Sequence, residues 1–399
     1  MGRDGWLRRL GPWVGIGTSP AALMMGGGVG EGLRGGELVA GLIVGTALLT
    51  TLAAGQGILG QRTRLPLASL TAGPLGEAGS RRTASLVMLA MMLGWFGVNV
   101  GVAGVALGRL IGVPDLAGIV LFAVVMLAVV GYGLGALSWS ALLAGLATTG
   151  LAVYGLRLAF DEHDATLSGG FAGGEPIGFL PAVALVVGYG AAFSLRTPDF
   201  THDLARTRHV VWCALAGLAV PVLAFGLAGA TLQAATGTWD LADVLRDLGS
   251  PTIAYLFVAL GFTGSVLTNI WSGALSLADA APRVSHRAAL VAVAVAGTAL
   301  AAGGFADLML PWLTVMALAA PGLVVVCAIH VVRGGEPRAG WGAAGLGAWG
   351  AGFASGLALD LAGSPLALPA AAIVPALAYW LLGRPGERDL AAARLGGSR

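Results

Sequence analysis

The chain has 399 residues, of which 57% are hydrophobic and 11% are charged, and its mean hydropathy is +0.85. A soluble domain carries about 25% charged residues, so these values exclude a protein that is surrounded by water on every side. The net charge of +2 gives no reason to expect a nucleic-acid partner. The composition instead predicts an all-α, multi-pass membrane protein whose 66 glycines let neighbouring helices approach closely.

A helix that spans a bilayer needs about 20 apolar residues. Charge-free stretches of this length predict twelve spanning helices, because the fourth stretch is long enough for two passes and has a glycine-rich bend at 131–135. The stretches are 10–30, 38–61, 83–108, 116–156, 176–195, 210–239, 248–278, 288–306, 308–332, 339–359 and 361–383. Such an arrangement predicts a single integral-membrane domain over residues 1–399.

The arginines predict how the chain is oriented in the membrane. If the N-terminus is cytoplasmic, only Arg34, Arg109, Arg157 and Arg246 fall in outer segments, which leaves 18 of the 22 basic residues on the cytoplasmic side. Cytoplasmic segments of membrane proteins carry an excess of arginine and lysine. We therefore expect a plasma-membrane (inner-membrane) protein with both termini in the cytoplasm.

Two of the predicted helices contain residues that interrupt helices. The first has glycines at 15 and 17, Pro20, and a second glycine group at 26–28, and the sixth has Gly188, Gly190 and Pro198. Backbone groups released by such breaks are tolerated in a membrane only where they face protein or a wet cavity. Matching breaks in helices 1 and 6 are typical of transporters with a five-plus-five inverted repeat. The repeats are predicted at 10–158 and 176–332, followed by two additional helices at 339–383.

No acidic or basic residue is predicted near the middle of a span. A proton relay usually needs a carboxylate or a histidine at that depth, whereas a sodium site can be built from backbone carbonyls and hydroxyls. The pattern favours sodium as the coupling ion, with a proton as the alternative. It also argues against an enzyme, because it offers no acid, base or metal cluster, and no cofactor is expected.

Short runs in several helices carry a resemblance to a known family. They are Gly94–Val98, Ala184–Gly188, Thr197–Phe200, Thr268–Ala274, Pro311–Thr314 and Ala319–Gly322. In order and spacing, over residues 10–335, they resemble the nucleobase:cation symporter-1 family, which includes cytosine permease and hydroxymethylpyrimidine transporters. This resemblance implies a LeuT-like fold and a symporter that imports a pyrimidine nucleobase or a related heterocycle by alternating access. The oligomeric state is left open, a monomer being compatible with the sequence.

The resemblance also implies a substrate site at mid-membrane, between helices 1, 3, 6 and 8. A heterocycle would stack on Trp95, and its edges would be read by polar groups such as Thr268 and Asn269. Two positions depart from the family pattern: Met92 stands where several members carry a glutamine, and Gly190 stands where they carry a stacking aromatic residue. Tyr189 or Phe193 could supply that ring instead, and the predicted substrate-binding residues include all seven positions.

For sodium, the resemblance implies carbonyls near the helix 1 break together with hydroxyls of helix 8. The matching positions are Ser19, Leu23, Thr263 and Ser265, with Thr268 as a further candidate. Two alternatives remain open. One is an amino-acid or other organic-solute transporter of the same fold, whose carboxylate would bind backbone amides at Gly26–Gly28. The other is a channel or a sensor, although repeated pore segments or charged rings are lacking.

Overall fold

The computed structural model describes residues 6–132, 134–163, 177–239, 244, 251–336 and 338–383. Within these residues the protein is built of helices without a strand, which confirms the all-α prediction. The helices before the long internal segment are α1 (Trp6–Gly17), α2 (Pro20–Gly32), α3 (Gly35–Thr63), α4 (Leu67–Gly79), η1 (Ser80–Ala84), α5 (Ser85–Ile111), α6 (Asp115–Val130) and α7 (Leu134–His163). Those after it are α8 (Phe179–Thr201), α9 (Thr207–Ala214), η2 (Leu215–Ala219), α10 (Val220–Thr236), α12 (Pro251–Gly261), α13 (Thr263–Ala280), α14 (His286–Ala302), η3 (Phe305–Leu308), α15 (Met309–Val332), α16 (Ala343–Leu361) and α17 (Ala367–Leu382).

The lengths and apolar composition of the helices fit a membrane protein. Seven helices of the described chain are long and apolar enough to cross a bilayer, and shorter apolar helices include α6, α14 and α17. The bend predicted near residues 131–135 is present, since α6 ends at Val130 and α7 begins at Leu134. The exact count of twelve spans stays a prediction. So does the cytoplasmic placement of both termini, because helix length and composition do not distinguish the two sides of a membrane.

The predicted break in the first helix is confirmed. Between α1 and α2 the backbone of Ser19 is extended, with φ −67° and ψ 144°, and Pro20 starts α2 without an N–H group. The Ser19 hydroxyl caps α2 by accepting a hydrogen bond from the Ala21 amide at 3.4 Å. Sequence and structure thus agree on a helix that ends and restarts inside the protein.

The predicted break in the sixth helix is wrong. α8 is one continuous helix from Phe179 to Thr201, and neither Gly188 nor Gly190 has a positive φ. These glycines serve packing instead. A Cβ on Gly188 would lie 1.8 Å from the Leu313 carbonyl oxygen, and one on Gly190 would lie 2.6 Å from the Leu49 side chain. Gly188 and Gly190 therefore let α15 and α3 approach α8, which needs no helix break.

Glycines 26–28 were expected to expose backbone amides at the helix 1 break, and this is also wrong. They lie inside α2 and are buried. A Cβ on Gly26 would come within 2.0 Å of the Gly226 carbonyl oxygen of α10. The amides of this segment belong to a packed helix, so the carboxylate-binding patch required by an amino-acid transporter is not formed there.

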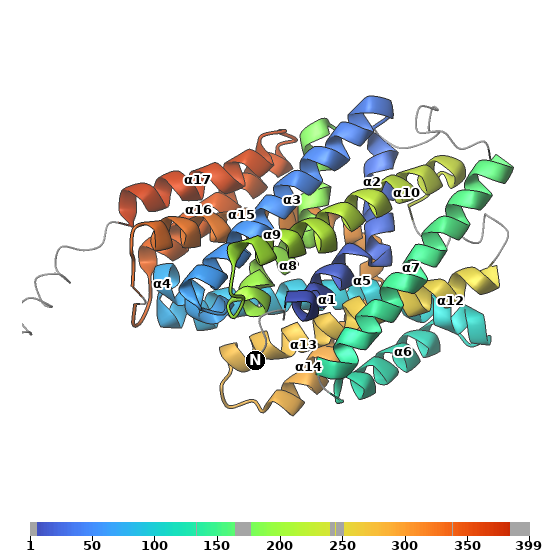
Figure 1. Ribbon diagram of the computed structural model, residues 1–399, viewed down its shortest axis with the longest axis horizontal. Coiled ribbons are helices and arrows are strands. Elements are labelled where there is room, and N and C mark those ends of the chain that lie inside the picture. The colour runs from blue at the N-terminus through green and yellow to red at the C-terminus, as the bar shows by residue number, and fades with distance from the viewer. Residues whose placement is uncertain are drawn as a thin grey trace, which may run out of the picture.

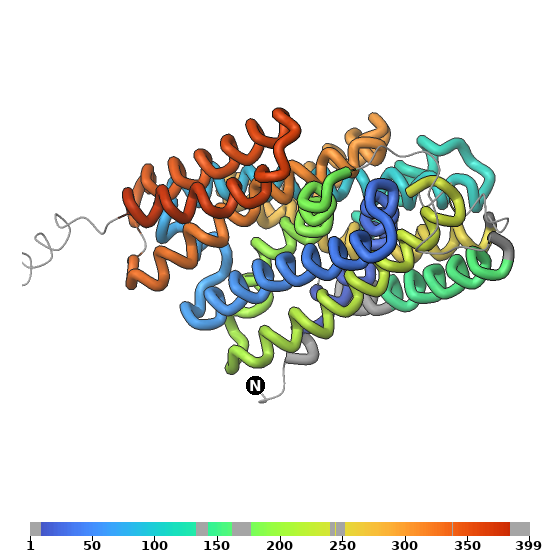
Figure 2. Tube along the Cα trace, turned by 90° about the horizontal axis from the view of Figure 1, so that it is seen from above, coloured from blue at the N-terminus to red at the C-terminus, as the bar shows by residue number. Residues whose placement is uncertain are grey.

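The helices run side by side around the break (Figure 1). α3 packs against α8, and α2 packs against α10. α16 and α17 pack against α15 at one edge of the bundle (Figures 1 and 2). α4, which was not predicted, turns at Gly76 with φ 75° and ψ 160° and packs beside α16. A positive φ at this position favours glycine. At the break between α1 and α2, Ser19 and Pro20 are buried.

Candidate functional site

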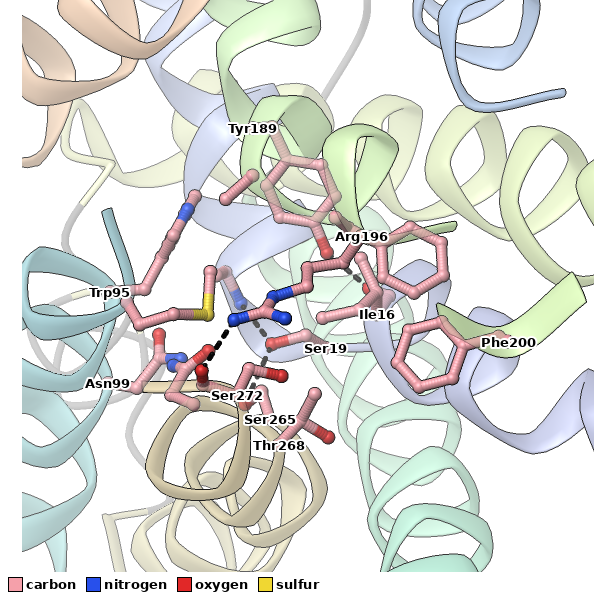
Figure 3. Close-up of a pocket in the computed structure, with 15 residues that line it drawn as sticks. Ile16, Ser19, Trp95, Asn99, Tyr189, Arg196, Phe200, Ser265, Thr268 and Ser272 are labelled. Carbon is pink, nitrogen blue, oxygen red and sulfur yellow. Dashed lines mark hydrogen bonds between the residues drawn. The ribbon is translucent and has the colours of Figure 1, made fainter. Parts of the chain in front are cut away.

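A small cavity, about 30 Å³ in volume, lies beside the break between α1 and α2 (Figure 3). Four parts of the chain line it. The lining residues are Ile16, Ser19 and Ala21 of the α1–α2 segment; Met92, Trp95 and Asn99 of α5; Tyr189, Ala192, Phe193, Arg196 and Phe200 of α8; and Ser265, Thr268, Asn269 and Ser272 of α13.

α5, α8 and α13 each present one face to the cavity. On α5 the lining positions Met92, Trp95 and Asn99 are three and four residues apart, and α13 repeats the pattern from Ser265 to Ser272. Residues three and four apart lie on the same side of a helix. The local sequence therefore sets which side chains face inward together, once the helices have packed.

Aromatic rings form one wall of the cavity. The rings of Trp95 and Tyr189 meet edge to face, with centroids 5.7 Å apart and an interplanar angle of 88°. The rings of Phe193 and Phe200 are stacked at 5.8 Å. Trp95, Tyr189 and Phe193 are each less than 10% exposed. A wall of this kind can hold a flat ligand, since aromatic faces stack on any planar ring.

Two carboxamides, one of them a helical turn from Trp95, also line the cavity. Asn99 and Asn269 are 2% and 3% exposed. In the part of the chain that the structure describes, Asn99 Oδ1 and Asn269 Nδ2 are buried atoms without a hydrogen-bond partner. Buried polar groups are nearly always paired. An acceptor and a donor are therefore left unpaired beside the same cavity.

Hydroxyls and carbonyls meet at the helix break. Ser19 Oγ donates to Ser265 Oγ at 3.4 Å, and Ser265 Oγ donates to the Phe262 carbonyl at 3.1 Å. Phe262 separates α12 from α13. The Tyr189 hydroxyl donates to the Ile16 carbonyl, which ties α8 to the end of α1. Oxygen atoms of this kind are the ligands that a sodium ion takes in broken-helix transporters.

The position of Arg196 differs from the expected end of the sixth helix. It was placed after the end of the sixth helix, whereas the structure puts it inside α8, where it is 6% exposed and lines the cavity. Asp199 is its counter-ion, with Arg196 Nη1 donating to Asp199 Oδ2 at 2.8 Å. A paired charge with hydrogen bonds is tolerated where an isolated charge is not, and so the helix continues past this residue.

A comparison with known protein families matches residues 4–339 to permeases for cytosine/purines, uracil, thiamine and allantoin. The match covers most of the chain. The chain belongs to this permease family. Among its relatives, the cytosine permease of Escherichia coli O157:H7 is 28% identical over 279 residues, and that of Escherichia coli strain K12 is 27% identical over 279 residues. Each alignment covers 68% of this chain and 62% of the relative.

Solved structures support the same fold for this permease-family chain. A nucleobase-cation-symport-1 transporter, Mhp1, closed with bromovinylhydantoin bound, has a TM-score of 0.75 at 19% identity over 92% of this chain and 90% of that one. The inward-facing conformation of Mhp1 has a TM-score of 0.77 at 18% identity over 94% and 90%. A Na⁺-coupled sialic acid symporter has a TM-score of 0.66 at 14% identity over 94% and 88%. These likenesses confirm the expected fold class.

The structure brings most of the predicted substrate residues of this permease-family chain to one cavity. Met92, Trp95, Tyr189, Phe193, Thr268 and Asn269 all line it, whereas Gly190 packs against Leu49. The Thr268 hydroxyl donates to its own helix at Gly264, 2.9 Å away.

Of the four positions predicted to hold sodium, two meet and two lie apart. Ser19 and Ser265 are in contact. The Thr263 hydroxyl instead donates to the Leu260 carbonyl at 2.7 Å. The Leu23 carbonyl faces α10, where a Cβ on Gly229 would lie 1.8 Å from it.

The sequence reasoning missed four lining residues with side chains suited to a ligand: Asn99, Arg196, Phe200 and Ser272. Asn99 had a readable signal, because it lies four residues after Trp95 and is the one polar side chain between Ser85 and Arg109. Arg196 had none, since its charge suggested a loop. Only the partners that surround it in the structure reveal it as a buried residue.

Proposed function

We propose that the protein is a secondary transporter that carries a pyrimidine nucleobase or a related heterocycle across the plasma membrane, coupled to sodium. One observation carries this proposal: aromatic rings and two buried carboxamides, each with an unpaired atom, line the same cavity at a broken helix. A flat heterocycle would stack on Trp95, and Asn99 and Asn269 would pair with its edge. Such edge bonds give selectivity, because a wrong ligand leaves buried groups unpaired.

The family and the solved structures support the proposal. Its relatives include cytosine permeases, and bromovinylhydantoin, a heterocycle, is bound in one structure of similar fold. For sodium, the support is the corner formed by Ser19, Ser265 and the Phe262 carbonyl. Helices that end inside the bundle leave carbonyls free for an ion.

The experiment is uptake of labelled cytosine into proteoliposomes, with and without an inward sodium gradient. Unlabelled uracil, adenine, hydroxymethylpyrimidine, hydantoin and several amino acids serve as competitors. We expect sodium-dependent uptake that one or more heterocycles block and amino acids do not. Uptake that follows a proton gradient and ignores sodium would overturn the coupling, and failure of every heterocycle to move or compete would overturn the substrate class.

The first variant is Trp95→Ala. Because stacking of a base on an aromatic ring is worth about 1–3 kcal/mol, cytosine uptake should fall by about tenfold or more, while folded protein remains in the membrane. Trp212→Ala is the matched control, because Trp212 is 55% exposed and lies on α9, away from the cavity. Equal uptake by the two variants would contradict the role of Trp95.

A further inference from the structure

The side chain of Arg196 crosses the centre of the cavity (Figure 3). It leaves α8 on the side of Tyr189 and reaches toward Ser272 of α13 (Figure 3). Among the residues that line the cavity, it is the one with a full charge. Its role therefore bears on which ligands the cavity accepts.

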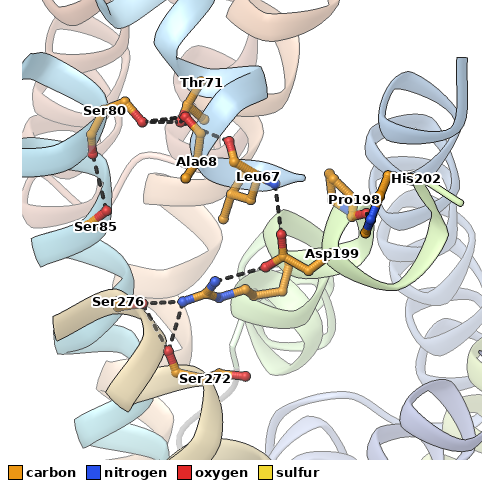
Figure 4. Close-up of polar contacts among 11 residues, drawn as sticks. Leu67, Ala68, Thr71, Ser80, Ser85, Pro198, Asp199, His202, Ser272 and Ser276 are labelled. Atoms are coloured by element: carbon orange, nitrogen blue, oxygen red, sulfur yellow. Dashed lines mark hydrogen bonds and ion pairs between the residues drawn. The ribbon is translucent and has the colours of Figure 1, made fainter. Parts of the chain in front are cut away.

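The terminal nitrogens of the guanidinium are held by three groups. Nη1 donates to Asp199 Oδ2 at 2.8 Å, and Nη2 donates to the Ser272 carbonyl at 2.7 Å and to Ser276 Oγ. Asp199 is fixed in turn, since its Oδ1 accepts from the Leu67 amide at 2.7 Å. Figure 4 shows Asp199 between Leu67 on one side and Ser272 and Ser276 on the other. The guanidinium plane is thereby locked between α8 and α13.

The Nε–H of Arg196 remains open. Nε is buried, and it has no hydrogen-bond partner within the described residues. The guanidinium cannot turn to satisfy Nε without losing the bonds to Asp199 or α13. A buried N–H of a charged group is costly to leave unpaired, and a charge-assisted hydrogen bond to an oxygen acceptor is about twice as strong as a neutral one.

We propose that Arg196 contacts the transported ligand and selects for a carbonyl oxygen, which accepts the Nε–H. The proposal rests on the proposed function and narrows its substrate class. Pyrimidinones such as cytosine and uracil present a carbonyl oxygen on the ring edge, whereas hydroxymethylpyrimidine has ring nitrogens and a hydroxyl but no carbonyl oxygen. A ligand that bears only donors or a positive charge at this edge is rejected.

The test measures competition by oxo and thio pairs, because sulfur accepts hydrogen bonds far more weakly than oxygen. The probes are cytosine against 2-thiocytosine and uracil against 2-thiouracil, in binding to purified wild-type protein. We expect the wild type to favour the oxo compound by about tenfold. In Arg196→Lys and Arg196→Gln, which lose the fixed Nε–H, the ratio should fall toward one.

Arg157→Gln is the matched control. The Arg157 side chain is 80% exposed, pairs with Asp161 on α7 and does not line the cavity. The same substitution is thereby made at an arginine that the ligand does not contact. We expect Arg157→Gln to keep the wild-type preference for oxo compounds.

Three results would overturn the inference: a wild type that binds oxo and thio compounds equally, arginine variants that keep the wild-type ratio, or failure of both arginine variants to fold. The last would make Arg196 a structural residue. If the wild type binds none of the heterocycles, the proposed function itself is wrong. Binding without discrimination would overturn only the role of Arg196.

Discussion

The segment from Gly15 to Pro20 and the segment from Gly188 to Pro198 look alike in sequence but differ in structure. Both combine glycines with a proline in an apolar run. The first is interrupted at Thr18 and Ser19, whereas the second stays helical through Pro198 to Thr201. The two segments nevertheless meet, since the Tyr189 hydroxyl of the continuous helix bonds the Ile16 carbonyl at the break.

The surroundings explain the difference. Ser19 and Pro20 form a helix start, with an extended backbone, a capping hydroxyl and a proline at the first helical position. Gly188 instead lies under the backbone of α15, at a distance that leaves no room for a side chain. Glycine in a membrane helix therefore predicts either a break or a close helix contact, and the neighbouring cap and proline decide between them.

The largest effect is expected from Gly188→Ala. The added Cβ would lie 1.8 Å from the Leu313 carbonyl oxygen and 2.6 Å from its carbon, both of them backbone atoms. Overpacking of this kind costs about 3 kcal/mol or more, so little folded protein should be recovered. Thermal unfolding measures the loss of stability, and size-exclusion chromatography in detergent measures the amount of folded protein.

Gly55→Ala is the control for this change, since a Cβ on Gly55 in α3 meets no atom within 4 Å. Alanine there should be neutral or stabilising by about 0.5–1 kcal/mol. If Gly188→Ala were as stable as Gly55→Ala, the close contact between α8 and α15 would be wrong.

A smaller effect is expected from Ser19→Ala at the break. The variant loses the cap of α2 and the contact with Ser265. Loss of a cap costs about 1 kcal/mol, so the melting temperature should fall modestly, and sodium-dependent uptake should weaken.

Ser285→Ala separates the two consequences of the Ser19 change. Ser285 caps α14 by accepting from the Ala288 amide at 3.3 Å, outside the cavity. It should lower stability by a similar amount without changing the sodium dependence of uptake. If the two variants show equal sodium-dependent uptake, the Ser19 hydroxyl acts only as a helix cap and does not bind sodium.

The smallest effect is expected from Gly190→Ala. Its Cβ would meet the ends of the flexible Leu49 side chain, which can move. The gain from alanine in a helix partly offsets the cost of moving Leu49, so stability should stay within about 1 kcal/mol of the wild type. A large loss would indicate that Gly190 needs a conformation that alanine cannot adopt, as the predicted break required.

The sequence was sufficient for the class of protein and for much of the cavity. Low charge and long apolar stretches give the all-α membrane fold. Trp95 and Asn269 were predicted from runs that resemble the family, and Phe193 was predicted as an alternative to the ring missing at Gly190. The helix period also places Asn99 on the same face of the helix as Trp95, four residues further along the chain. Asn99 could therefore have been predicted from the sequence as a lining residue.

By itself, then, the sequence determined which side chains share a helix face and where α2 can start, because spacing, caps and prolines act within a few residues. Only the tertiary structure decided that α8 continues past Gly188 and that Arg196 is buried. These outcomes depend on groups far away in the chain: the backbone of Leu313 against Gly188, and Ser272 and Ser276 beside Arg196. The stability of a close backbone contact, or of a charge inside the protein, is set by the atoms that surround it after folding.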